Sequence, residues 1–321
     1  MMTVTPALYK NVPALTLGTA RYRLTLLPGE GAKLVSFQTI ADGREFLWQN
    51  PAPHYGHVGL TDSYVDGECS SFDDMFPTID PIVMNRGERT GVIYPDHGEA
   101  CRLPFSCTVL PNGIRLAAES SALKYRYEKT VTEAEDGSFV IDYAIHNLTA
   151  DPFPSLWAGP CMVQVSNGGR VVTALPMGSA IDLMFDNREE FGVSGDRLTV
   201  TPAMLTSRVS PALTNSYKYY FSAPTPEGFL GYRHADGVTF MMRFDPASLP
   251  HIGVWMNDGY FKDCYCVGLE PCNLGYDTVY NAEAKGQRFA ISPKGCLRFA
   301  LTLSVEKQAT DTLSTGKKIG L

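Results

Sequence analysis

A glutamate near the C-terminal end of the chain is the first residue whose neighbours suggest chemistry. Residues 268–273 read Gly-Leu-Glu-Pro-Cys-Asn, so Glu270 follows an apolar segment and directly precedes a proline. Proline cannot continue a central strand ladder, so we expect the strand to end here and Glu270 to lie at its rim. A carboxylate there can act as a general base or bind ligand hydroxyl groups. The alternative is a solvated rim carboxylate without a function.

A second group of titratable residues surrounds a glycine. Residues 94–99 read Tyr-Pro-Asp-His-Gly-Glu, which is typical of a loop. Histidine titrates near neutral pH, so His97 is a candidate acid, base or hydrogen-bond donor. The alternative is a turn in which Asp96 and His97 bond to their own backbone.

Two adjacent carboxylates lie among aromatic residues in a third segment. Residues 71–78 read Ser-Phe-Asp-Asp-Met-Phe-Pro-Thr. Asp73 and Asp74 could accept hydrogen bonds from the hydroxyls of a sugar, while the neighbouring rings cover its C–H face. The alternative is a helix N-terminus, where aspartate meets the positive end of the dipole. We expect one short helical turn at Phe72–Ile79 and another at Asn281–Gly286.

The tryptophans and cysteines give weaker indications. Trp48 is expected in the core, whereas Trp255 precedes a polar loop and is a candidate platform for a ring. Eight cysteines in a long chain without an export signal favour free thiols over disulfides. Cys264, Cys266 and Cys272 do not have the spacing of a Cys-x-x-Cys pair, so we favour simple burial over a zinc site. No glycine-rich phosphate loop, Gly-x-Ser-x-Gly elbow or His-Glu-x-x-His motif is found.

Composition excludes several classes of partner. The formal net charge is −7, which disfavours nucleic acid because such binding depends on clustered Lys and Arg. No basic stretch followed by an apolar run begins the sequence, and no run of about 18 apolar residues occurs. We therefore expect a cytoplasmic protein that does not bind a membrane.

Alternation with a period of two dominates the sequence. Residues 297–305 place Leu, Phe, Leu, Leu and Val on one face, and residues 139–145 behave in the same way. Asp136-Gly137 and Asp236-Gly237 each separate two such runs and predict hairpins. The chain is therefore predicted to be all-β, with large antiparallel sheets packed as a sandwich. We expect a single domain over residues 1–321, with a tail at Lys307–Leu321.

An ordered set of short motifs resembles the aldose 1-epimerase (galactose mutarotase-like) family. The motifs span nearly the whole chain in the order of that family: Gly31–Ser36 with Arg44–Trp48, Asp74–Thr78, Asp96–Gly98, Asn147–Trp157, Gly253–Trp255 and Leu269–Pro271. The resemblance implies a β-supersandwich fold and reversible opening of an aldose ring, without a metal or another cofactor. The glutamate matched by Glu270 takes the proton of the anomeric hydroxyl in that family, and a histidine protonates the ring oxygen.

The sequence departs from the family at the position of that histidine. Residues 156–161 read Leu-Trp-Ala-Gly-Pro-Cys where the family has His-Pro. His97 matches the other histidine of the family site, and we hypothesise that it takes over the acid role. The family's sugar-binding arginine has no clear match, and Arg102 or Arg86 is the candidate substitute.

These residues lead to a single working interpretation. The catalytic candidates are Glu270 and His97, and the residues expected to shape the pocket are Asp74, Arg102, Trp157 and Trp255. The expected partner is a small-molecule sugar, and the expected assembly is a monomer or a homodimer. The rival interpretations are a sugar-binding protein that has lost the acid, and another reaction of the same fold such as polysaccharide cleavage.

Overall fold

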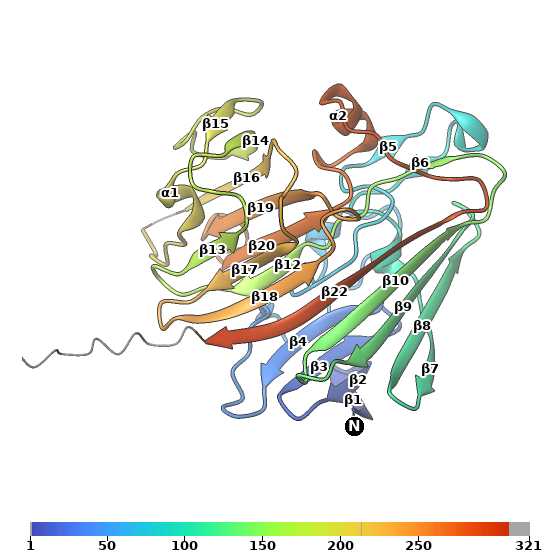
Figure 1. Cartoon of the computed structure of the whole chain (residues 1–321), viewed down its shortest axis with the longest axis horizontal. Helices are drawn as coiled ribbons and strands as arrows, with labels where there is room; N and C mark the ends of the chain where they lie inside the picture. Colours follow the sequence, from blue (N-terminus) through green and yellow to red (C-terminus); the bar gives the residue numbers. More distant parts are fainter. Residues whose placement is uncertain (1, 213, 308–321) are drawn as a thin grey trace, which may run out of the picture.

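A computed structural model describes residues 2–212 and 214–307 of the 321. The predicted tail, apart from Lys307, lies outside the described residues. Three antiparallel sheets form most of the molecule (Figure 1), and the named strands of the described residues all pair in antiparallel fashion. The prediction of an all-β protein built from large antiparallel sheets is confirmed.

The largest sheet has eight strands. Their order is β13 (Arg170–Thr173), β17 (Phe229–Arg233), β18 (Val238–Phe244), β22 (Cys296–Lys307), β10 (Phe139–Asn147), β9 (Tyr125–Glu133), β8 (Gly113–Ser120) and β7 (Ser106–Leu110). The period-two runs become β10 and β22, which pair with each other at the centre of the sheet. One face of each strand is buried, as the alternation predicts.

The second sheet carries most of the candidate site. Its order is β12 (Cys161–Gln164), β20 (Tyr265–Cys272), β19 (His251–Asp258), β16 (Asn215–Phe221), β14 (Ala180–Asp186) and β15 (Arg197–Thr199). All seven residues of β16 are buried, on both faces of the strand. A lysine inside such a strand must therefore find charged partners in the protein.

The third sheet and the minor elements complete the fold. The four-stranded sheet joins β1 (Thr3–Tyr9), β2 (Val12–Gly18), β3 (Tyr22–Leu27) and β4 (Lys33–Thr39). Two small ribbons pair β5 (Ile82–Val83) with β6 (Ile93–Tyr94) and β11 (Phe153–Pro154) with β21 (Ala290–Ile291). The helices are α1 (Pro202–Leu205) and α2 (Val279–Ala284), with 3₁₀ turns η1 (Tyr64–Asp66), η2 (Gly87–Arg89) and η3 (Ala100–Arg102).

Aromatic contacts hold the four-stranded sheet against the largest one. The ring of Phe37 in β4 lies 5.1 Å from that of Tyr22, 5.4 Å from that of Phe240 and 6.3 Å from that of Phe139. Such pairs contribute about 0.5–1.5 kcal/mol each beyond their buried area. In Figure 1 the four-stranded sheet lies at the bottom, beside the ends of β9, β10 and β22.

Both predicted hairpins are confirmed. Gly137 joins β9 to β10 with a φ of 82°, and Gly237 joins β17 to β18 with a φ of 83°. Positive φ is the conformation that favours glycine in tight turns.

The helical turn predicted at Phe72–Ile79 is wrong. This segment is extended instead: Phe72 bridges Leu34 and Cys161, and Met75 bridges Ala158. Backbone groups of Phe72, Met75, Phe76 and Pro77 thus pair with neighbouring chain segments and not with each other in a helix. The turn predicted at Asn281–Gly286 is present as α2, which begins earlier because the Thr278 side chain caps the Asn281 N–H.

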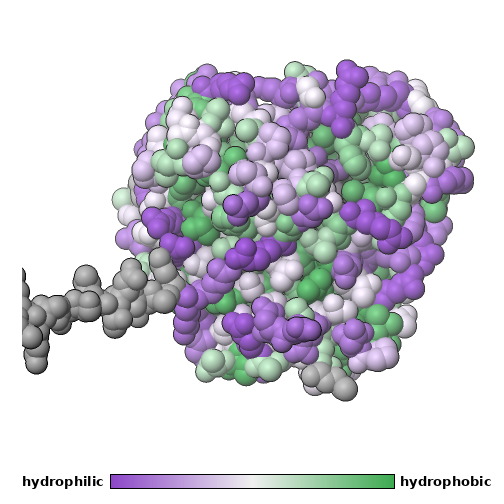
Figure 2. Space-filling model, in the orientation of Figure 1, coloured by the Kyte–Doolittle hydropathy of each residue, from purple (hydrophilic) through white to green (hydrophobic). Residues whose placement is uncertain are grey.

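One face of the molecule is seen in the space-filling view (Figure 2). On the face seen in Figure 2, hydrophilic and hydrophobic residues are interspersed. Within the described part of the chain, no helix is long and apolar enough to cross a membrane.

Candidate functional site

A cavity of about 390 Å³ opens where β16, β19 and β20 meet the loop before β5 and the loop after β6. Its polar lining includes Asp80, His97, Ser216, Lys218, Glu270 and Asp277. Its apolar lining includes Val65, Met75, Met184, Trp255 and Phe261. A hollow with apolar walls and a few convergent polar groups is typical of small-molecule sites.

Strand register brings Glu270 beside two residues of β16. Gly253 in β19 is paired with Tyr220 on one side and with Glu270 on the other. A Cβ atom on Gly253 would lie 2.7 Å from Tyr220 Cε1 and 3.0 Å from Glu270 Oε2. The absence of a side chain at position 253 therefore lets Tyr220 and Glu270 meet across the middle strand.

Two expectations about Glu270 are corrected by the structure. The strand does not end before Pro271, because β20 runs to Cys272 and the Pro271 carbonyl accepts a hydrogen bond from Gly159 N. Proline lacks only the donor, so its carbonyl can still pair. Glu270 is 4% exposed, which excludes a solvated rim carboxylate.

The two oxygens of Glu270 have different surroundings. Oε2 lies 3.0 Å from Lys218 Nζ and 3.4 Å from the hydroxyl oxygen of Tyr220. Oε1 has no hydrogen bond from the described residues. One oxygen is therefore fixed by the protein, while the other is available to a ligand.

Lys218 joins Glu270 to a second carboxylate. Its Nζ lies 2.7 Å from Asp277 Oδ1, which also accepts a hydrogen bond of 2.7 Å from the Tyr220 hydroxyl. We call Lys218, Glu270 and Asp277 the open cluster, because all three line the cavity. Two carboxylates share one ammonium group, which leaves the cluster with an excess of negative charge.

Burial and neighbouring charges set the protonation states of the open cluster. Burial raises the pKa of Glu270, and Lys218 acts against that rise. Burial alone would lower the pKa of Lys218, but Asp277 and Glu270 outweigh it, and the net result is a raised pKa. Lys218 therefore remains a cation at neutral pH. Nearby Asp80, which has no ion pair among the described residues, also has a pKa raised by burial and by Asp277.

His97 is held in one orientation on the loop that precedes η3. Its Nδ1 lies 2.8 Å from Asp96 Oδ1, and its ring stacks on Tyr64 with centroids 4.4 Å apart. The carboxylate of Asp96 also accepts a hydrogen bond from Tyr64 N. Burial raises the pKa of Asp96, but its contacts with His97 and Tyr64 N outweigh this and the net pKa is lowered. A hydrogen on Nδ1 thus faces an ionised carboxylate, and Nε2 has no partner among the described residues.

Arg102 fixes this loop and does not line the cavity. Its guanidinium donates hydrogen bonds to the carbonyls of Asp96 and Gly98, at 2.6 and 2.5 Å, and to those of Gly59 and Asp62. The structure therefore places Arg102 behind His97, in contact with the loop backbone. Arg86, the other candidate arginine, pairs with Glu283 and is also absent from the cavity lining.

Asp74 and Trp157 also lie away from the cavity. Asp74 is 1% exposed and forms an ion pair with Lys129, and burial raises its pKa. Trp157 is fully buried, donates a hydrogen bond of 2.7 Å to the Tyr127 hydroxyl and packs on Phe299. Neither residue is positioned to shape the pocket.

The segment that lacks the family's histidine has no room for a side chain at one position. A Cβ atom on Gly159 would lie 2.7 Å from Trp157 Cη2 and 2.9 Å from Phe72 Cε2. Pro160 lines the cavity instead. Of the residues predicted for the site, the structure brings together Glu270, His97 and Trp255, whose indole donates a hydrogen bond of 2.8 Å to Ser216 Oγ.

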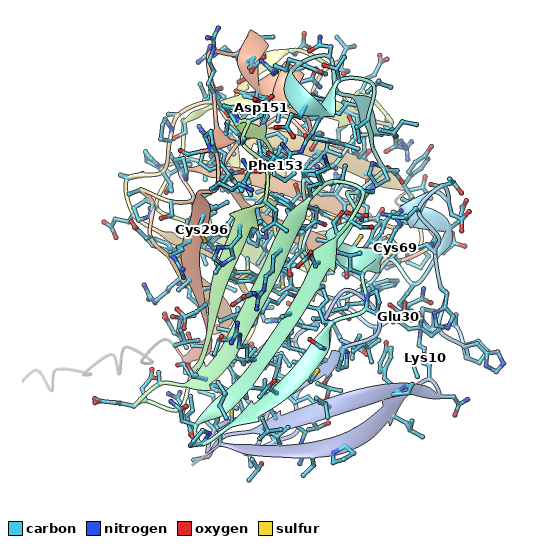
Figure 3. The ribbon with its side chains drawn as sticks, turned by 90° about the vertical axis from the view of Figure 1, so that its right-hand side faces the viewer. Lys10, Glu30, Cys69, Asp151, Phe153 and Cys296 are labelled. Atoms are coloured by element: carbon cyan, nitrogen blue, oxygen red, sulfur yellow. The ribbon has the colours of Figure 1, made fainter. Side chains whose placement is uncertain are left out.

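The cysteines are all free, and six of them are buried. Cys264 Sγ and Cys266 Sγ lie 3.9 Å apart on one face of the chain. Cys69, which lines the cavity, and Cys296 lie to either side of the strands β8–β10 in Figure 3. Among the residues that the structure describes, no three His, Cys, Asp or Glu side chains are arranged to hold a metal ion.

The comparisons with solved structures identify the fold. A candidate aldose 1-epimerase from Klebsiella pneumoniae subsp. pneumoniae superposes with a TM-score of 0.73 at 16% identity, over 95% of this chain and 83% of that one. A galactose mutarotase-like protein from Clostridium acetobutylicum gives 0.66 at 12% identity, over 96% and 99%. A third, from Lactobacillus casei, gives 0.63 at 15% identity, over 91% and 100%. The chain therefore has the galactose mutarotase-like fold.

Sequence comparisons add no relative. No family model and no curated protein matches the chain. At these low identities the structural likeness shows the fold alone, so a role for the cavity has to be argued from the residues that line it.

Proposed function

We propose that this protein binds a sugar and interconverts the anomers of an aldose by acid/base ring opening. The observation that carries the proposal is the asymmetric Glu270 carboxylate in a cavity that also contains His97. The likeness to aldose 1-epimerase and mutarotase-like structures supports the same reaction class.

Each catalytic group has a definite part in the proposed reaction. Glu270 Oε1 takes the proton of the anomeric hydroxyl, while Lys218 holds Oε2 in place. The C1–O5 bond breaks, and the ring oxygen receives a proton from His97 Nε2. Asp96 orients the imidazole for this transfer through its contact with Nδ1. Rotation about C1–C2 and closure in reverse then give the other anomer.

The cavity suits an uncharged sugar. When ionised, Asp80, Glu270 and Asp277 carry three negative charges, and the cavity lining offers the single ammonium group of Lys218 against them. A sugar phosphate would need cations to bind its oxygens, and Lys218 already serves two carboxylates. The side chains of Trp255 and Phe261, whose rings meet edge to face, offer an apolar wall for the C–H face of a pyranose.

A sugar-binding protein without catalysis is the second candidate. It is favoured by Gly159 and Pro160, which stand where the family has its acid. In that case the cavity would bind a sugar while anomer exchange stayed at the uncatalysed rate.

One experiment tests the proposal and separates the two candidates. Anomer exchange is followed by polarimetry and NMR for a panel of neutral hexoses and pentoses, and binding of each sugar is measured by calorimetry. We expect faster exchange for at least one sugar, and a loss of about 10²–10⁴-fold in His97→Asn because positioned acids contribute that much. Binding without faster exchange would favour the second candidate, and neither binding nor exchange would contradict both.

A further inference from the structure

Lys218 has one hydrogen-bond donor for which no described residue supplies an acceptor. An ammonium group has three N–H donors, and the structure gives Lys218 two acceptors, Glu270 Oε2 and Asp277 Oδ1. Lys218 is only 8% exposed, yet it lines the cavity. A buried cation whose third donor has no acceptor among the described residues is costly unless a ligand supplies one.

This donor lies close to the carboxylate that removes the proton in the proposed reaction. Nζ lies 3.0 Å from Oε2, and Oε1 is the other oxygen of the same carboxylate. An oxygen atom in the cavity can therefore accept a hydrogen bond from Nζ while it gives its own proton to Oε1. In the proposed reaction that oxygen is O1, the anomeric oxygen of the sugar.

We propose that Lys218 is a catalytic residue that hydrogen-bonds O1 and stabilises the negative charge that develops on it. This inference rests on the proposed function and adds a residue that the resemblance does not supply. Preorganised donors aimed at a developing oxyanion are worth about 10²–10³-fold in rate when one is removed.

The proton balance does not pass through Lys218. The proton of O1 moves to Glu270 Oε1, the O1 electron pair forms the carbonyl, the C1–O5 bond breaks, and O5 takes the proton of His97 Nε2. The two carboxylates beside Lys218 hold its own protons in place, so it contributes charge and orientation only. Ring closure reverses each transfer and returns both groups to their starting states.

The simplest alternative is that Lys218 only neutralises buried carboxylates. Lys218→Met would then act through stability, since it leaves Glu270 and Asp277 without a cation. The double variant Lys218→Met/Asp277→Asn removes one positive and one negative charge, so the net charge of the open cluster is unchanged. The double variant therefore has the cluster charge of the parent, and it differs from Asp277→Asn only at position 218. The two comparisons together separate the lysine from the charge balance.

The test combines a rate with a binding cycle. Anomer exchange is measured for the parent, Asp277→Asn and the double variant, with the sugar that the parent converts fastest. Calorimetry then compares that sugar with its 1,5-anhydro analogue, which lacks O1. Arg298→Gln is the control for the loss of a cation, because Arg298 is exposed and lies outside the cavity.

We expect exchange in the double variant to be about 10²–10³-fold slower than in Asp277→Asn. Removing Lys218 should weaken binding of the aldose about tenfold and leave binding of the anhydro analogue unchanged, because only the aldose has the oxygen that Lys218 contacts. Equal rates, or equal losses of affinity for the two sugars, would overturn the role of Lys218 while leaving the proposed function intact. A parent protein that neither binds nor converts any sugar would overturn both.

Discussion

Two buried groups of lysines and carboxylates differ in the ratio of cations to anions. Lys33, Lys129, Asp73 and Asp74 form what we call the sealed cluster, in which Lys33 pairs with Asp73 and Lys129 pairs with Asp74. None of its four members lines the cavity, and each is at most 3% exposed. In the open cluster one lysine serves two carboxylates, and all members line the cavity.

The difference lies in the charges and donors that remain unused. In the sealed cluster cations and anions are equal in number, and Lys129 also donates to the Ala32 carbonyl. In the open cluster, Glu270 Oε1 has no hydrogen-bond donor among the described residues, and one N–H of Lys218 has no acceptor among them. Burial of an ion costs several kcal/mol, so unequal pairing beside a cavity is expected where a ligand completes it.

The sealed cluster also contacts a residue that lines the cavity. Asp73 accepts a hydrogen bond from the Tyr64 hydroxyl, and the ring of Tyr64 stacks on His97. The two adjacent aspartates thus have structural roles: Asp73 contacts Tyr64, and Asp74 pairs with Lys129. A buried ion pair and a catalytic carboxylate can therefore have similar exposure, and the adjoining cavity and the ratio of cations to anions distinguish them.

The largest expected effect is a loss of protein stability when the sealed cluster loses a cation. Lys129→Met should lower the free energy of unfolding by about 3–5 kcal/mol, because it leaves Asp74 buried without its cation. Urea unfolding measures the change, and the anomer exchange rate of the remaining folded protein should equal that of the parent. Exposed Arg298→Gln is the control and should change stability by less than about 0.5 kcal/mol. A loss below about 1 kcal/mol, or a selective loss of exchange, would contradict the structural role.

A smaller effect concerns how the rate of anomer exchange depends on pH through the open cluster. The Asp277 charge raises the pKa of Glu270, so Asp277→Asn should lower that pKa. Exchange requires the ionised base and is lost as pH falls through the pKa of Glu270. The acid limb of the pH–rate profile should therefore move to lower pH in Asp277→Asn.

The matched control for this shift is Asp142→Asn on the exposed face of β10. Its acid limb should coincide with that of the parent when kcat/KM is measured across pH. An acid limb that stays in place or moves upward in Asp277→Asn would show that Asp277 does not act on the base.

Much of the fold follows from local patterns in the sequence. The alternating run at 297–305 lies within β22, and Asp136-Gly137 and Asp236-Gly237 form the hairpins that they predict. The resemblance to mutarotase-like proteins is confirmed at the level of fold. The segment at Phe72–Ile79 was beyond such reasoning, because its extended form depends on bridges to Leu34 and Cys161, far away in sequence.

The residues of the site are harder to predict from the sequence, because the register between strands that are distant in the chain brings them together. Glu270, His97 and Trp255 reach the cavity, whereas Asp74, Arg102 and Trp157 are adjacent to important segments but point elsewhere. Lys218, Asp277 and Tyr64 were missed. A signal was available for Lys218, since it lies within Asn-Ser-Tyr-Lys-Tyr-Tyr-Phe, where a lone charge in an aromatic strand indicates a buried cation that needs partners.

The most direct measurement of the central claim is anomer exchange in Glu270→Gln, followed by two-dimensional exchange NMR. Glutamine keeps the shape of the side chain but cannot take a proton at neutral pH, so exchange should fall by about 10²–10⁴-fold. Glu119→Gln, on the exposed face of β8, should exchange at the parent rate. Exchange in Glu270→Gln as fast as in the parent would contradict the assignment of the base.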